Sequence, residues 1–575
     1  MDFTEQLRIL EAANGKPALL ALVTVDLAHH TLPAEERSRI KDALLAAAVP
    51  HWCDRDLLAA LLQTTPKEAD HLLVQLNTLT VIEPFPARGE HAINVHETAR
   101  LALREHLRTT NAPLWQKLSA RARAHVAQSQ EPHARIEALY HLFATDQAAA
   151  AEECEALDRE FNIVGSPEVR HALALSLQEL TAAGWLTGAA EVEALLPPLE
   201  VRAQRGEGAQ FETQARELVE LARNSSVPSG IGRAHCLLGD VLQTKGRLDD
   251  ALTAFSEFLA IFQRLAGGHP SNAGWQRELA VAHANVGDIH QEQGRLDDAL
   301  AAFIESLAIS QRLAAVDPSS AGWQSELAVG HSRIGGIHQE QGRLGNALAA
   351  FIESLTILQR VATTSPSNAR WQRDLAVAHL RVGGIHQEQG RLGNALAAYS
   401  EALAILQRLV TTDPSNARLQ RDLAVAHARV GDIRQNQGRL DDALAAFRQY
   451  LAMFQRLAAT DPSNAGWQRE LAVAHAEVGD IHQKQGRLDD ALAAFRQHFA
   501  IFQRLTATDP SNVGWQRELA VAQNRLGLVF LEIGDEKQAQ SSFRSAIKTM
   551  AKAAKMSPEN AGWKIELDSM KSWLD

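Results

Sequence analysis

Apolar residues in the second half of the chain recur at helical spacing. After Trp275, one stripe follows steps of three and four: Leu279, Ala282, Val286 and Ile289. After Gly294, a second stripe contains Ala299, Leu300, Phe303 and Leu307. The two stripes predict a pair of amphipathic helices of about 18–20 residues, each roughly 30 Å long.

The residues between the stripes predict where each helix begins and ends. Ser271 or Asn272 can cap the first helix by accepting a hydrogen bond from its free backbone N–H groups. Gly294 is typical of the residue just after a helix. Asp297 and Asp298 fall in the first turn of the second helix, where negative charge is favourable.

The same pattern returns every 48 residues. A turn glycine marks each copy, at Gly246, Gly294, Gly342, Gly390, Gly438, Gly486 and Gly534. A tryptophan keeps the same step, at Trp275, Trp323, Trp371, Trp467, Trp515 and Trp563, with Leu419 in the one gap. A single helix pair cannot bury its own stripe, so the repetition predicts stacked pairs. We expect seven 48-residue units and a capping helix from Ala561 over residues 232–575.

The order of small, large, alanine and aromatic residues carries a resemblance. It reads Gly287, His290, Ala299, Phe303 in one copy and Gly335, His338, Ala347, Phe351 in the next. This order resembles the tetratricopeptide repeat, whose usual period is about 34 residues, so the longer period here should lengthen the helices. The resemblance implies a mainly α fold: a right-handed α-solenoid of helical hairpins, whose first helices line a groove for a partner peptide or helix.

One glycine per copy lies on the packing face of the first helix: Gly239, Gly287, Gly335, Gly383, Gly431, Gly479 and Gly527. We expect these glycines to let the second helix approach closely. Histidines form two further columns: His283, His331, His379, His427, His475, and His290, His338, His386, His482. Zinc ligands lie about 2 Å from one ion, whereas stacked helices lie about 8–10 Å apart. We therefore interpret the histidines as packing residues, expect no metal or cofactor, and expect protonation below about pH 6 to loosen the stack.

Other positions change between copies, and these form another face of the first helix. They are Asn285, Arg333, Arg381, Arg429, Glu477 and Arg525 in one column, Asp288, Asp432 and Asp480 in the second, and Glu292, Glu340, Glu388 and Lys484 in the third. The resemblance places this face in the partner-binding groove. The groove would be basic around Arg333, Arg381 and Arg429 and could receive an acidic segment. The alternative is a solvated surface under weak constraint.

Residues 1–125 have a different pattern. From His51 to Leu107 the order is helix, helix, strand–turn–strand, helix, with Thr65 and Pro66 opening the second helix. This is the order of a winged helix. The helix that would enter DNA offers Lys67, Glu68, Asp70, His71, Gln75 and Asn77, which is close to neutral, so nucleic acid is not the expected partner.

Three segments carry a second resemblance: "PHWCDRDLLAALL", "VHETARLALREHL" and "EALYHLFATD". They resemble the winged-helix and helical region that follows the nucleotide-binding core in STAND-type (NB-ARC) signalling ATPases. His96 stands where that class often carries a Met-His-Asp sensor that contacts the nucleotide phosphate, but Glu97 replaces the aspartate. Lys16 is followed by Pro17, and no phosphate-binding loop is found, so we expect no nucleotide binding and a possible association with a separate ATPase or effector.

Residues 126–231 read as a helical connector. "PEVRHALALSLQELTAAG" and "AQFETQARELVELAR" predict amphipathic helices, whereas "LPPLEVRAQRGEG" and "NSSVPSGIG" predict breaks.

Composition adds limits on function. The 575 residues carry a net charge of −12, which disfavours binding to nucleic acid or an anionic membrane. The three cysteines are far apart, and the first residues lack an apolar signal core, so we expect a cytoplasmic protein without a membrane anchor. No catalytic motif is present. The leading interpretation is a non-enzymatic scaffold or sensor arm that binds a peptide or protein in bacterial STAND-type signalling. The alternative is a winged-helix DNA-binding regulator whose repeats bind an effector.

Overall fold

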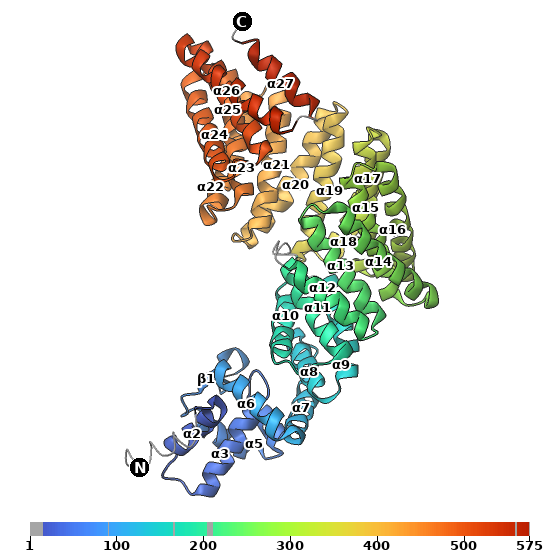
Figure 1. Cartoon of the computed structure of the whole chain (residues 1–575), viewed down its shortest axis with the longest axis vertical. Coiled ribbons are helices and arrows are strands. Elements are labelled where there is room, and N and C mark those ends of the chain that lie inside the picture. The colour runs from blue at the N-terminus through green and yellow to red at the C-terminus, as the bar shows by residue number, and fades with distance from the viewer. Residues whose placement is uncertain (1–14, 90, 165–166, 204–210, 558–559, 574–575) are drawn as a thin grey trace. The chain divides into compact units, whose positions relative to one another are not determined.

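The structure is a computed structural model that describes residues 15–89, 91–164, 167–203, 211–557 and 560–573 (Figure 1). The described chain is almost entirely helical, with one two-stranded sheet, which confirms the expected mainly α fold. It divides into two compact units, Met1–Ile309 and Ser310–Asp575, and each is described by itself. The prediction that the N-terminus has no apolar signal core concerns mainly residues 1–14, which lie outside the described residues.

The described part of the first unit begins with five helices and a hairpin. These are α2 (Pro17–Ala28), α3 (Ala34–Ala47), α4 (Arg55–Leu62), α5 (Pro66–Leu76), β1 (Ile82–Pro84), β2 (Ile93–Val95) and α6 (Glu97–Thr110). The strands are antiparallel, with Ile82 opposite Val95. The Thr65 hydroxyl accepts a hydrogen bond from the backbone N–H of Glu68 at 3.3 Å, as its capping position predicts. The expected order of helix, helix, hairpin and helix is therefore present.

Six connector helices follow: α7 (Ala112–Val126), α8 (Pro132–Thr145), α9 (Gln147–Val164), α10 (Pro167–Ala182), α11 (Gly188–Arg202) and α12 (Glu212–Asn224). One hydrophobic core runs from Ala18 in α2 to Ala194 in α11. The predicted break over residues 196–208 is wrong at Pro197 and Pro198, because both lie inside α11, and residues 204–208 lie outside the described residues. Pro197 has no N–H to donate to the carbonyl of Glu193, but the Cys154 thiol donates to that oxygen at 3.4 Å.

The repeats form helix pairs. The first unit contains α13 (Pro228–Thr244), α14 (Leu248–Gly268) and α15 (Ala273–Glu292). Then α16 (Leu296–Val316) crosses the unit boundary. The second unit contains α17 (Ala321–Glu340), α18 (Leu344–Thr364), α19 (Ala369–Glu388), α20 (Leu392–Thr412), α21 (Ala417–Asn436), α22 (Leu440–Thr460), α23 (Ala465–Lys484), α24 (Leu488–Thr508), α25 (Val513–Ile533), α26 (Glu536–Met556) and α27 (Ala561–Lys571). A typical pair has 20 and 21 residues, so the long period is used in long helices.

The helix ends follow the sequence signals. Asn272 Oδ1 accepts from the backbone N–H of Trp275 at 3.0 Å, so Asn272 rather than Ser271 is the cap. Gly294 has a φ of +74°, which is left-handed and suits glycine. The backbone N–H of Arg295 then donates to the carbonyl of His290 at 2.8 Å and closes the helix end.

Among the described helices, α16 is the one that is long and apolar enough to cross a membrane by length and composition. Its mean hydropathy is 1.4 over the most apolar 18-residue window, and 44% of that window is buried. A core helix has the same properties, and α16 is the second helix of a repeat pair.

The glycine column lies against the aromatic ring of its own hairpin, as predicted. A Cβ atom added at Gly335 would lie 2.8 Å from Cε1 of Phe351, and one added at Gly383 would lie 2.5 Å from Cε1 of Tyr399. The rings are buried, with Phe351 and Tyr399 each only 1% exposed. The absence of a side chain therefore sets how closely the two helices of a pair approach.

Gly335→Ala is expected to lower the free energy of unfolding by about 1–3 kcal/mol, because the new methyl group overpacks against Phe351. The neighbouring Gly336 supplies the control, since a Cβ there meets no atom within 4 Å. Gly336→Ala should raise stability by about 0.5–1 kcal/mol through helix propensity. Urea denaturation of the two variants checks this, and equal effects of the two substitutions would contradict the close-approach explanation.

Candidate partner-binding face of the first helices

The structure places the predicted groove residues at the surface of the first helices. Six are exposed: Glu292, Glu340, Arg381, Glu388, Arg429 and Lys484. Seven are half-buried: Asn285, Asp288, Arg333, Asp432, Glu477, Asp480 and Arg525. Within the same helices the glycines of the packing column and the Ile289 column are buried. The three columns that change between copies are thus reachable by a partner, whereas the Gly287 and Ile289 columns are occupied by packing.

Part of this face also joins neighbouring repeats. The side-chain amide of Gln243 in α13 donates to Glu292 of α15 at 2.5 Å. Gln339 of α17 makes the equivalent bond to Glu388 of α19, and Gln483 of α23 makes it to Glu532 of α25. The sequence pattern indicated partner binding alone for Glu292 and Glu388, and their role in stacking was not predicted.

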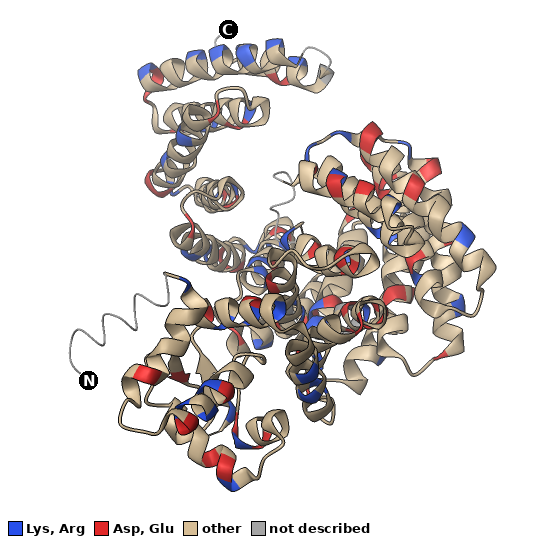
Figure 2. Ribbon diagram, turned by 60° about the horizontal axis from the view of Figure 1, so that its bottom comes forward, with Lys and Arg blue, Asp and Glu red and all other residues tan. Residues whose placement is uncertain are grey.

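The basic stretch of the second unit lies on α17, α19 and α21, and each of these helices contacts the next. Arg381 is exposed, and Gly384 stands where other copies carry aspartate. Arg429 lies 3.6 Å from Asp432 in its own helix, so its charge is partly matched. Figure 2 shows blue and red segments together on many of the helices.

The next helices of the same unit carry acidic side chains. Glu477 of α23 occupies the column that holds arginine on α17, α19 and α21. Its pKa is raised to about 7, first by burial and then by the carboxylates of Asp480 and Asp432. Arg525 of α25 lies 3.1 Å from Asp480. Within the second unit, the column therefore changes from arginine on α17, α19 and α21 to glutamate on α23.

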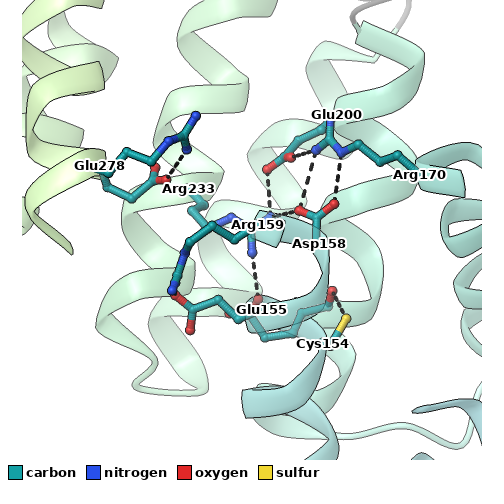
Figure 3. A network of polar contacts seen from close by, with 10 residues as sticks. Cys154, Glu155, Asp158, Arg159, Arg170, Glu200, Arg233 and Glu278 are labelled. Carbon is teal, nitrogen blue, oxygen red and sulfur yellow. Dashed lines mark hydrogen bonds and ion pairs between the residues drawn. The ribbon is translucent and has the colours of Figure 1, made fainter. Parts of the chain in front are cut away.

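In the first unit, Asn285 lines a cavity of about 220 Å³ together with residues of α9, α11 and α13. A buried ionic network forms its wall (Figure 3). Arg233 of α13 lies 2.8 Å from Asp158, 2.9 Å from Glu193 and 3.1 Å from Glu200. Arg170 of α10 is also paired with Asp158, at 3.0 Å. This network ties the first repeat to the connector helices, and sequence analysis did not identify it.

The carboxylates around Arg233 differ in their ionisation. Burial raises the pKa of Glu193 to about 7, although Arg233 opposes that shift. The pKa of Asp240, which lines the same cavity, is also raised to about 7, by burial and then by the carboxylates of Glu200 and Asp288. Glu193 and Asp240 therefore bind protons near neutral pH more readily than ordinary carboxylates do.

The histidines of the first column are half-buried on the first helices. Burial lowers the pKa of each: His283, His331, His379, His427 and His475. Within the residues that the structure describes, no group of three or more histidine, cysteine, aspartate or glutamate side chains could hold a metal ion. The first column therefore consists of partly buried histidine side chains on the first helices of the repeats.

The N-terminal candidates lie on two separate surfaces. His96 is exposed, 3.8 Å from Glu83, at the edge of a cavity of about 1250 Å³. On α5, Lys67, Asp70 and His71 are exposed, while Glu68 is paired with Arg39. The side chains that α5 presents are of mixed sign.

Family models now decide the nature of the repeats. A model described as tetratricopeptide repeat matches residues 230–312, and a second model with the same description matches residues 430–498. The chain contains tetratricopeptide repeats. Such tetratricopeptide pairs commonly mediate contacts between proteins. No curated protein matches the chain in sequence.

Three solved structures are among those similar to this chain. A STAND protein (signal transduction ATPase with numerous domains) with a tetratricopeptide repeat sensor, from Pyrococcus horikoshii, is 13% identical over 88% of this chain and 71% of that chain, with a TM-score of 0.54. The apo form of RapI is 12% identical over 71% of this chain and 98% of that chain, with a TM-score of 0.46. A Rap protein complexed with competence and sporulation factor is 13% identical over 72% and 99%, with a TM-score of 0.42. At such identities the likeness concerns the fold alone.

Proposed function

We propose that this tetratricopeptide repeat protein is a non-enzymatic scaffold or sensor arm that binds a peptide or protein segment on its first helices. One observation carries the proposal: on the first helices, the Asn285, Asp288 and Glu292 columns differ between copies and are exposed or half-buried, whereas the Gly287 and Ile289 columns are packed. A stack alone has no need for Arg381 where the next-but-one copy has Glu477. A surface that reads a partner needs such differences.

The partner is an acidic or phosphorylated segment, bound in the second unit by Arg333, Arg381 and Arg429. Guanidinium groups bind carboxylate and phosphate through paired hydrogen bonds. Gly336 and Gly384 stand on α17 and α19 where α15, α21 and α23 carry an aspartate.

A place in STAND-type signalling in the cytoplasm is part of the proposal. It is supported by the order of elements from α4 to α6, by the segments around His96, and by the STAND protein with a tetratricopeptide repeat sensor among similar structures. In this arrangement a winged-helix-like module joins the repeats to a separate ATPase or effector. The mixed charge of α5 gives little support to the alternative, a DNA-binding regulator.

Replacing Arg333, Arg381 and Arg429 together by Glu should weaken the affinity for the bound segment by at least about a hundredfold, because attraction becomes repulsion at three sites. The variant should then no longer capture the segment. The measurement is a pull-down with mass spectrometry on the wild-type chain, followed by titration of the captured partner against both proteins.

The matched control changes three arginines of the second helices, Arg360, Arg408 and Arg456, to Glu. They are exposed, belong to the same repeats and give the same change of net charge. If the control weakens binding as much as the first variant does, general charge attraction rather than the first-helix face is responsible. A first variant that retains every partner would refute the basic site.

A further inference from the structure

A long trench lies in the first unit, between α6 and α10, and it is separate from the first helices of the repeats. Its volume is about 1250 Å³. The α6 wall is formed by Glu97, Arg100, Leu101, Arg104, Glu105 and Arg108. The α10 wall includes Ala172, Leu175, Ser176, Glu179 and Ala182. Both sets follow steps of one, three or four residues, so each helix turns one continuous face toward the trench.

The trench has the dimensions of one helix. Each wall covers about three turns, or roughly 17 Å at 1.5 Å per residue. A helix about 10–12 Å wide fills roughly 120–170 Å³ per residue at that rise, so the trench volume corresponds to about seven to ten residues, or two to three turns. Typical small-molecule pockets are smaller, at about 300–1000 Å³.

Charged side chains of the trench floor pair with one another. Arg104 donates to the hydroxyl of Tyr140 at 2.8 Å and is paired with Glu179. His51 lies 2.7 Å from Glu137; burial lowers the pKa of His51, but the Glu137 carboxylate opposes burial and the pKa is raised. The carboxylates of Glu137 and Glu179 are thus both engaged with side chains of the floor.

The side chains left for recognition are apolar on the walls and acidic at one end. Leu101 is 39% exposed and Leu175 is 53% exposed, which is unusual for large apolar residues that flank one trench. At the hairpin end, Glu83 and Glu97 are exposed carboxylates. The arginines of the rim are matched: Arg108 is paired with Glu105 at 2.6 Å and Arg88 with Glu131 at 3.3 Å.

We infer that this trench binds an amphipathic α-helix of a protein partner, about three turns long, with its apolar stripe on Leu101 and Leu175 and a basic side chain at Glu83 and Glu97. Such helix-in-groove recognition uses anchors at spacings of three and four residues. This second docking site is independent of the partner proposed for the repeats.

The test uses three synthetic fluorescein-labelled peptides of about 14 residues. One carries a leucine stripe and two lysines at one end, one has glutamates in place of the lysines, and one has the same composition with the leucines off the stripe. Fluorescence anisotropy with the full chain is expected to show binding of the lysine peptide at least about tenfold tighter than of the other two. Equal binding of all three peptides would overturn the inference.

Variants then locate the bound peptide. Leu175→Asp should weaken the lysine peptide by at least about tenfold, and Glu97→Lys should reverse the preference between lysine and glutamate peptides. Val74→Asp is the control, because Val74 is 64% exposed on α5 and does not line the trench. Circular dichroism checks that each variant is folded. Equal weakening by Val74→Asp would overturn the inference, as would a chain that forms dimers through the trench and loses them on Leu175→Asp.

Discussion

Replacing Arg233 by methionine is expected to reduce the opening free energy of the α9–α13 region by about 3–5 kcal/mol. Breaking a buried ion pair from one side leaves charges without compensation in a medium that solvates them poorly. Asp158 is 3% exposed and Glu193 is 2% exposed, so neither carboxylate can turn to water. Arg170 alone cannot match the remaining acids, and protonation of one of them would be the remaining way to relieve the site.

Native-state hydrogen exchange is the suitable measurement, because repeat proteins open in segments rather than as one unit. The control is Arg216→Met, which removes a surface pair with Glu212 at 2.9 Å on α12, where the arginine side chain is 50% exposed. That change should cost less than about 1 kcal/mol. Similar losses for the two variants would show that the buried network does not stabilise the junction between the connector and the first repeat.

Replacing His498 by tyrosine should remove a large part of the acid sensitivity of the α23–α25 region. The side chain is 3% exposed, Nδ1 donates to the carbonyl of Ala472 at 3.0 Å, and Nε2 is buried without a hydrogen-bond partner among the described residues. Burial, followed by the charge of Arg525, lowers the pKa of His498 to about 4; His475 acts in the same direction, and the Ala472 carbonyl opposes it.

The direction of the pH effect follows from these values. Above about pH 6.5, the ordinary pKa of histidine, His498 is neutral in both states and has no effect. Between pH 6.5 and 4 the unfolded chain binds a proton that the folded chain excludes, so the free energy of unfolding decreases as the pH is lowered. The total loss is about 3 kcal/mol at 1.36 kcal/mol per pKa unit.

Tyrosine is the matched replacement because Tyr450 occupies the equivalent position one repeat earlier and is buried there. The measurement is urea denaturation of both proteins at several values between pH 7.5 and 4. The difference between their free energies of unfolding at each pH isolates the effect of His498 from groups with the opposite pH dependence, such as Glu477 with its raised pKa. Parallel stability curves for the two proteins would refute the role of His498.

The repeats were predictable from sequence because each copy tests the others. The turn at Gly294, the Asn272 cap and the contact between Gly335 and Phe351 all rest on residues close in sequence, where local rules are sufficient. The order of elements from α4 to α6 was predictable for the same reason. The use of the groove residues by a partner stays a prediction.

The network around Arg233 was not predicted from the sequence, because its acidic partners belong to the connector, which is far away in sequence and does not repeat. A signal was nevertheless present. The position of Arg233 is valine in each later copy, at Val281, Val329, Val377, Val425, Val473 and Val521. The proline pair of α11 led to the wrong prediction of a helix break for a related reason. The group that donates to the carbonyl left free by Pro197 is the Cys154 thiol, which belongs to another helix. The trench was not predicted either, because its walls belong to two helices that become neighbours only after folding.

The glutamine–glutamate bonds between neighbouring first helices give the order of the copies a physical meaning. Loss of one whole 48-residue copy, α19 with α20, would remove Gly383 together with its own ring, Tyr399, and leave every other hairpin intact. The new junction would bring Gln339 opposite Asn436 instead of Glu388. A gene built from nearly identical copies can therefore shorten or lengthen without destroying its hairpins, and the junctions alone record which copies were neighbours.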